Sequence, residues 1–220
     1  NTSSNLALQE IQNDDGSPNN ENIPQIAYLP PFAGITDRES RLSPAMRNRL
    51  IGQGLSGGVI RNSIYDIHLE NQNKRRRLKE GRNKIANKDL NLLRETDPWE
   101  ILQKTLFDLF SLKLEVTPFN EQYHSYLKIE CVAGVVNGYQ FKKHKNFNAR
   151  DIMVEGSGFL QWLSVYTLAL SEEFNVILLD EPDAHLHTQL QKNLTERLEE
   201  ITIKKGKQVL LATHSTELIR

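Results

Sequence analysis

Apolar and polar positions alternate with a period that changes several times along the chain. The first 23 residues are rich in Asn, Asp, Ser and Gln, which predicts a flexible lead-in over residues 1–23. An apolar run at residues 23–29, stopped by two prolines, predicts a short strand. Glycines punctuate residues 30–58, which predicts a loop. Apolar positions then recur at helical spacing, so residues 24–111 are expected to hold one strand followed by a helical segment.

One helix start within this segment is marked by its residue types. Asp97 followed by Pro98 is typical of a helix N-terminus, because Asp caps the first N–H groups and Pro fits the first helical position. Trp99, and Trp162 further along the chain, fall at helical positions. We interpret both tryptophans as core residues.

Residues 112–150 show the pattern of strands. The stretches LKLEV, SYLKIECV and GYQFK are typical of short antiparallel strands, and Asn137-Gly138 predicts a hairpin turn. After Arg150, helices are predicted at 158–170 and 185–203, and continuous apolar strands at 175–180 and 208–212. Two such strands joined by a helix predict a parallel sheet covered by helices.

Composition narrows the classes of protein. The 220 residues are 38% hydrophobic and 25% charged, with a mean hydropathy of −0.52. No apolar run reaches the length of about 18 residues that a membrane span needs, so we expect no membrane contact. The single cysteine, Cys131, excludes an internal disulfide framework, makes a cytoplasmic location the default and is expected to be a buried hydrophobic residue.

Charge is balanced overall but not locally. The 27 Lys and Arg against 28 Asp and Glu give a net charge of −1, so a nucleic-acid contact would need a local patch. Such a patch is centred on Lys74, Arg75, Arg76 and Arg77, with further cations at positions 79, 82, 84 and 88. Two interpretations stay open: a solvated helix face, or a contact with the phosphates of DNA.

Two carboxylates follow the first buried strand directly. Residues 176–179 are all apolar and run into Asp180 and Glu181. Because ligands bind at the carboxyl ends of parallel strands, these acids are expected at the mouth of a site. Asp180 suits Mg²⁺ held beside a phosphate, and Glu181 suits a general base that polarises an attacking water.

Two further features strengthen this prediction. His214 lies just beyond the second buried strand, where it could donate to a terminal phosphate. Gly156-Ser157-Gly158 opens a helix, so its N–H groups, its hydroxyl and the positive end of the helix dipole form an anion site. From Ser157 to Asp180 is 23 residues (180 − 157), enough for one helix and a turn back into the sheet.

Together these residues resemble the C-terminal half of an ABC-type ATPase head. Gly156, Ser157, Gly158 and Gln161 are similar to its signature motif, and Asp180-Glu181 to its Walker B pair. Residues 183–187 (DAHLH) resemble the D-loop, and His214 the switch histidine. The sequence pattern LLDEPDAHLH…THSTELI is closer to the RecF, SMC and OLD branch than to transporter cassettes, and this branch includes bacterial AAA-family ATP-binding proteins.

The resemblance implies a fold and a division of the chain. The fold would be α/β, a P-loop NTPase-like, mainly parallel sheet flanked by helices, with a helical insertion and a few antiparallel strands. The lead-in, the strand plus helical segment and the antiparallel strands would occupy residues 1–23, 24–111 and 112–150. Residues 151–220 would carry the signature, Walker B and switch-histidine part of the ATPase core.

The resemblance also implies ATP and Mg²⁺ as cofactors and an ATP-bound homodimer. Asp180 would coordinate the metal, Glu181 and His214 would act in catalysis, and Ser157 would cap the terminal phosphate from across the dimer interface. The remaining residues implied to bind nucleotide are Gly156, Gly158, Gln161 and Asp183.

One element of the family pattern is missing. A P-loop of the form Gly-x-x-x-x-Gly-Lys-Ser/Thr, which wraps the phosphates, occurs nowhere in the 220 residues. We expect that the chain is a piece of a longer protein whose N-terminal P-loop lobe lies outside it. The chain alone is then expected to be inactive although the intact protein is an ATPase. The alternative is a degenerate ATPase.

Two other motifs are interpreted as structural. Residues 55–58 (LSGG) spell most of a transporter signature, but 124 residues separate Ser56 from Asp180 (180 − 56), whereas a signature helix leads almost directly into the Walker B strand. We interpret them as a turn before a helix. His185 and His187 are two residues apart and share no helix face, and the D-loop resemblance accounts for them without a metal.

Three hypotheses remain for the process that the ATPase drives. The branch resemblance and the basic stretch favour DNA repair or phage defence. An OLD-type ATPase-nuclease, whose nuclease domain would follow the switch histidine, is the second. The third is a non-hydrolysing scaffold, against which the intact Asp180, Glu181 and His214 argue.

Overall fold

A computed structural model describes residues 24–218 apart from 33, 80, 138–139 and 217. The predicted lead-in and Gly138 of the predicted hairpin turn lie outside the described residues. None of the helices in the described part has the length and apolar character that crossing a membrane requires.

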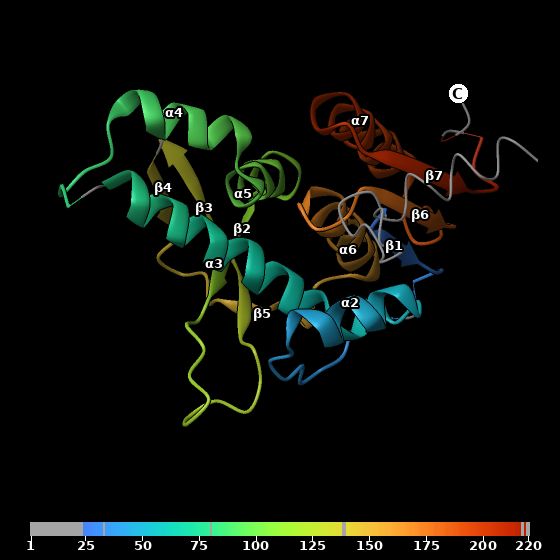
Figure 1. The fold of residues 1–220 in the computed structure, drawn as a ribbon, viewed down its shortest axis with the longest axis horizontal. Helices are drawn as coiled ribbons and strands as arrows, with labels where there is room; N and C mark the ends of the chain where they lie inside the picture. Colours follow the sequence, from blue (N-terminus) through green and yellow to red (C-terminus); the bar gives the residue numbers. More distant parts are fainter. Residues whose placement is uncertain (1–23, 33, 80, 138–139, 217, 219–220) are drawn as a thin grey trace, which may run out of the picture.

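A three-stranded parallel sheet forms one half of the molecule. Its strands are β1 (Ile26–Leu29), β6 (Val176–Asp180) and β7 (Gln208–Ala212), in the order β1-β6-β7. Figure 1 shows this sheet beside α6 (Ser157–Leu170) and α7 (Thr188–Lys205), with the second half of the molecule on the other side. The α/β fold predicted from the sequence is confirmed.

Helix α6 is the centre of the core. Every residue from 159 to 170 is buried, because α6 packs against α7 and also against α3 and α5 of the other half. Trp162 is fully buried and contacts Phe110 and Tyr166 through their rings. Trp162 and Trp99 are therefore both core residues, as predicted.

A buried lysine holds the carboxyl end of α6. The Nζ of Lys207 donates to the carbonyl oxygens of Ala169 and Ser171. A cation at this position satisfies carbonyl groups that have no partner within the helix and complements the helix dipole. Burial lowers the pKa of Lys207 to about 8.

Along the chain, β1 is followed by four helices that precede the strands of a second sheet: α2 (Pro44–Gly52), α3 (Ile60–Lys79), α4 (Asn87–Thr96) and α5 (Pro98–Phe110). Asp97 caps α5 by accepting from the N–H groups of Trp99 and Glu100, as its position before Pro98 predicted. Helix α2 lies where a loop was predicted. It has no continuous apolar face, and its residue types therefore did not reveal it, although Ser43 caps it.

The second sheet is antiparallel. Its strands are β2 (Leu112–Val116), β3 (Ile129–Asn137), β4 (Gln140–Lys143) and β5 (Arg150–Asp151).

A 3-10 turn at Ser56–Gly58 stands just before α3, so the interpretation of residues 55–58 as a turn is confirmed. Gly57 is needed there, because a Cβ atom would lie 2.2 Å from the carbonyl oxygen of Gly34.

Buried charges fix the first turn of α3. The carboxylate of Glu39 accepts from the backbone N–H groups of Arg61 and Asn62 at 2.9 and 2.7 Å. The guanidinium of the fully buried Arg61 donates to both carboxylate oxygens of Asp151, just before the turn that leads into α6. The start of α3 is thereby tied to the segment that precedes α6.

Cys131 provides a test of the core. Its side chain is fully buried, as predicted, and burial raises the pKa of its thiol to about 12. Because the folded pKa lies above the ordinary value, the neutral thiol contributes stability that is present below pH 9 and is lost as the pH rises through 12.

We expect the native protein to resist thiol reagents at pH 8, where only about one thiol in ten thousand is ionised at this pKa. Colorimetric thiol titration at pH 8 checks this, with the same protein in guanidinium as the control. Labelling of the native protein as fast as of the unfolded chain would contradict the buried position.

Candidate functional site

The three parallel strands end at one edge of their sheet. Leu29 pairs with Leu179, and Asp180 pairs with Ala212. The ladder continues one residue further, where the N–H of Glu181 donates to the carbonyl oxygen of Ala212 at 2.7 Å. Residues that follow β6 and β7 are therefore held side by side.

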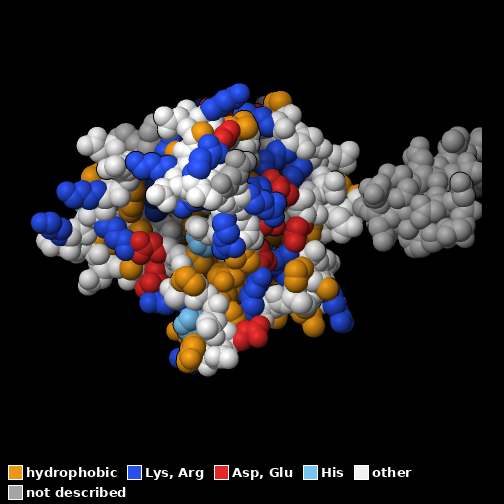
Figure 2. Space-filling model, turned by 60° about the vertical axis from the view of Figure 1, so that its left-hand side comes forward, with side chains coloured by type: hydrophobic (Ala, Val, Ile, Leu, Met, Phe, Trp, Pro, Cys, Tyr) orange, Lys and Arg blue, Asp and Glu red, His pale blue; other side chains and the backbone are white. Residues whose placement is uncertain are grey.

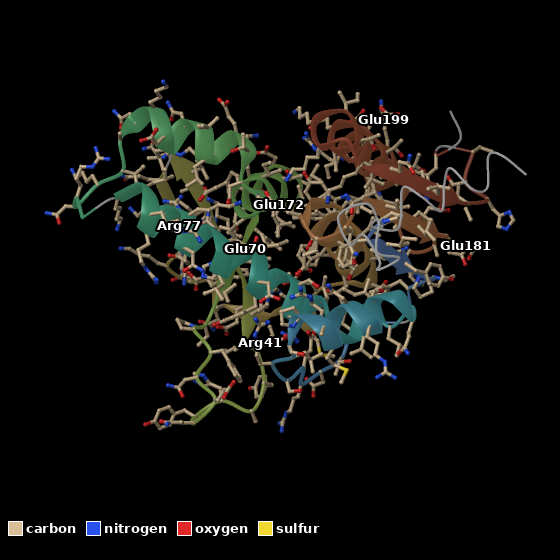
Figure 3. All side chains as sticks on the ribbon, viewed as in Figure 1. Arg41, Glu70, Arg77, Glu172, Glu181 and Glu199 are labelled. Carbon is tan, nitrogen blue, oxygen red and sulfur yellow. The ribbon has the colours of Figure 1, made fainter. Side chains whose placement is uncertain are left out.

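Glu181 and His214 meet at this edge. The Nε2 of His214 lies 3.7 Å from Oε1 of Glu181, and the side chains are 94% and 43% exposed. Figure 3 shows Glu181 on the right-hand side of the molecule, near the tips of the strands. Glu181 has a φ of 47°, a left-handed conformation that is costly for a residue other than Gly. Strain of this kind is concentrated at functional sites.

Asp180 borders a cavity. The hydroxyl of Tyr28 donates to Oδ2 of Asp180 at 3.5 Å, and a cavity of about 470 Å³ lies between Asp180, α6 and residues 29–32, 34–36 and 54–58. No group of three or more His, Cys, Asp or Glu that could hold a metal occurs among the described residues. Mg²⁺ beside a nucleotide needs only one or two carboxylates together with phosphate oxygens, so Asp180 fits such a role.

Gln161 holds the loop that follows β6. Its side chain is 2% exposed, and its Nε2 donates to the carbonyl oxygen of Glu181 at 3.2 Å. Its Oε1 accepts from the N–H of His185 at 3.1 Å. The amide of Gln161 is thus used within the chain, where it fixes the backbone on both sides of the turn at residues 182–185.

The Gly-Ser-Gly turn is exposed. Ser157 is the first residue of α6, and Gly156 precedes it without any side-chain cap. Since the N-cap residue offers no side-chain oxygen, the first N–H groups of α6 suit an anion. Gly158 has a packing reason as well, because a Cβ atom there would lie 2.7 Å from the carbonyl oxygen of His185.

The loops after β6 and β7 are also linked by side chains. Asp183 accepts a hydrogen bond from the hydroxyl of Thr213, and Gln191 of α7 contacts both loops. The roles of Tyr28, Gln191 and Thr213 were not foreseen from the sequence. Only Thr213 had a signal, since it stands next to the predicted His214.

The structure divides the predicted basic stretch in two. Lys74 lies 3.4 Å from Asp97 and 3.5 Å from Glu172, and Arg75 pairs with Glu100. Arg76, Arg77 and Lys79 are exposed instead. Figure 2 brings this part of the molecule forward and shows Lys and Arg side chains over the upper part of the face. Figure 3 places Arg77 far from Glu181 along the length of the molecule.

Solved structures with some similarity are heads of SMC proteins. One, from work on ATP-driven dimerization and DNA-stimulated activation of SMC ATPases, shares 14% identity over 59% of this chain and 75% of that chain, with a TM-score of 0.41. An SmcHead bound to the C-winged helix domain of ScpA shares 17% over 61% of this chain, with a TM-score of 0.39. The Smc head of Pyrococcus furiosus, with an extended coiled coil and the C-terminal domain of ScpA, shares 15% over 80%, with a TM-score of 0.40.

The chain covers 40% of the SmcHead chain and 48% of the Pyrococcus furiosus chain. A comparison with curated proteins found no match. A family model described as "AAA domain, putative AbiEii toxin, Type IV TA system" matches residues 32–220. This match confirms the nucleotide-binding ATPase class, which was predicted with Asp180, Glu181 and His214 as its motif residues. The chain therefore belongs to this family of AAA domains.

Proposed function

We propose that the chain is the signature, Walker B and switch-histidine part of an ABC-type ATPase head whose ATP-driven dimerisation acts on DNA in repair or phage defence. The observation that carries this proposal is the pairing of Glu181 with His214 beside Asp180 at the edge of the parallel sheet. The family description, which names a type IV toxin–antitoxin system, is compatible with a role in defence.

The geometry gives each residue a task. Glu181 is exposed enough to accept a proton from an attacking water, and its backbone is fixed by Gln161 and Ala212. His214 can donate from a ring nitrogen to an oxygen of the terminal phosphate. Asp180 would hold Mg²⁺, which when bound offsets the negative charge of the phosphates.

Ser157 supports a dimeric arrangement. It is exposed at the start of α6, where the N-cap residue, Gly156, has no side chain that could cap the N–H groups. In our proposal these groups bind the terminal phosphate of a nucleotide held by a second copy. Nucleotide then lies between two chains, and its binding energy favours dimerisation.

The exposed outer edge of β7 is evidence that a further strand pairs with it. β7 is at the end of the described sheet, and its Leu210 and Leu211, on opposite faces, are 53% and 37% exposed. An apolar edge strand of this kind is normally paired and covered. We infer that a strand carrying the phosphate-binding loop pairs here, since no such loop occurs in the 220 residues.

Nucleic acid would contact the end of α3. Arg76, Arg77 and Lys79 are exposed, whereas Lys74 and Arg75 are engaged with acidic partners. We propose that the exposed cations Arg76, Arg77 and Lys79 reach the phosphates of DNA, whereas Lys74 and Arg75 of the predicted patch do not.

The isolated 220-residue chain is expected to release no phosphate from ATP above background, because it lacks the backbone groove that supplies most of the phosphate binding. Phosphate release at saturating Mg²⁺-ATP measures this, with Glu181→Gln as the control for contaminating activity. Turnover that disappears in Glu181→Gln would show that the chain is a complete ATPase.

In the intact protein, Glu181→Gln should lower kcat by about 10²–10⁴, because the amide cannot accept a proton from water. The variant should accumulate as an ATP-bound dimer in sedimentation velocity. Glu199→Gln removes the same charge from the exposed face of α7, far from the site, and should behave as the wild type (Figure 3). A Glu181→Gln protein that stays monomeric with ATP would contradict the dimer model.

Arg76→Gln combined with Arg77→Gln should weaken binding to duplex DNA and lower the slope of log K against log salt by about 2, one unit for each lost phosphate contact. Fluorescence anisotropy over a salt series measures the slope. The control is Lys192→Gln with Lys204→Gln, which removes two exposed charges from α7. Equal slopes for both pairs would exclude α3 as the DNA contact.

A further inference from the structure

His214 lies beyond the last hydrogen bond of the sheet. The ladder between β6 and β7 ends at Glu181 and Ala212, so main-chain pairing does not fix residues 213–215. The ring of His214 is almost fully exposed, and its Nε2 lies 3.7 Å from Oε1 of Glu181. The position of this histidine therefore depends on the contacts of the residues on either side of it.

Gln191, in the first turns of α7, contacts both loops through one amide. Its Nε2 donates to the carbonyl oxygen of Leu186 at 2.8 Å, and more weakly to that of Asp183 at 3.5 Å. Its Oε1 accepts from the hydroxyl of Ser215 at 2.8 Å. One half-buried side chain thus bridges the loop after β6 and the loop after β7.

The orientation of this amide is determined by its neighbours. The carbonyl oxygen of Leu186 can only accept, so the nitrogen of Gln191 must face it. The oxygen then faces Ser215, whose hydroxyl can donate. A side chain with both a donor and an acceptor at this separation is required, and neither Glu nor Met provides both.

A second bridge lies on the other side of His214. The hydroxyl of Thr213 donates to Asp183 and accepts from the backbone N–H of Ser215 at 2.9 Å. Both neighbours of His214 are therefore anchored to the segment that follows Glu181, while its ring extends into solvent.

We propose that Gln191 is a positioning residue, which holds His214 at a fixed place relative to Glu181 by tying Ser215 to residues 183–186. Its consequence for catalysis rests on the function proposed above. Its consequence for the loops does not, so the two can be tested separately.

The first test uses the nucleotide-free protein. Gln191→Met preserves the size and helix preference of the side chain but removes both bonds. Hydrogen exchange of the Ser215 amide, which donates to the hydroxyl of Thr213, should then rise about fivefold, the effect of losing about 1 kcal/mol of hydrogen bonding. Gln189→Met, two residues away and exposed, is the matched control. Exchange in Gln191→Met equal to that in Gln189→Met would overturn the proposal.

The second test uses ATP turnover by the intact protein. Gln191→Met should lower kcat about tenfold and leave KM for ATP within about twofold, because the groups at the terminal phosphate are misplaced while binding is retained. Ser215→Ala should lower kcat less, and the double variant should be no slower than Gln191→Met, since both changes break one bridge.

The outcomes separate the proposals. Faster exchange with a lower kcat and a non-additive double variant supports the positioning role. Additive losses, or an unchanged kcat with faster exchange, would overturn it, even if Gln191→Met is less stable, because Ser215→Ala reports the same bridge. A wild-type protein with no Glu181-dependent turnover would refute the ATPase function, while the exchange result would still decide whether Gln191 ties the loops together.

Discussion

The parallel pairing of β6 with β7 is the constraint on which the rest of the site depends. It aligns Asp180 with Ala212, and its last hydrogen bond, from Glu181 to Ala212, carries the alignment one residue beyond the strands. A shift of β7 by one residue would turn its side chains to the opposite face and remove His214 from Glu181. Val209 of β7, which pairs with Ile177 and packs against the core, would lose that packing in such a shift.

Helix α6 and the loop that follows β6 are packed together as one unit. Gln161 bonds to Glu181 and His185, and Gly158 allows the backbone of residue 185 to approach the helix closely. Because Asp151 joins the start of α3 to the turn before α6, the same unit is connected to the helical half of the molecule. A displacement of α6 would therefore move the signature-like turn and the backbone of Glu181 together.

The sequence predicted the elements that have strong local signals. Continuous apolar runs placed β6 and β7 within one residue, and Asp97-Pro98 marked α5, because these patterns depend on neighbouring residues alone. Helix α2 was missed for lack of an apolar face, and the helical stretch after residue 59 is interrupted near Gly81, whose φ is 77°. The pairing of Lys74 with Glu172 joins residues 98 positions apart, and no local pattern indicates it.

The buried thiol of Cys131 has a practical consequence for the study of motion in this protein. Since the only cysteine of the chain is fully buried and un-ionised at neutral pH, it does not react with thiol-directed labels. A cysteine placed at an exposed position such as Tyr123, on the long β2–β3 loop, would accept a fluorophore or spin label selectively. With a second cysteine placed on the other half, distances between the two halves of the molecule become measurable without first removing a native residue.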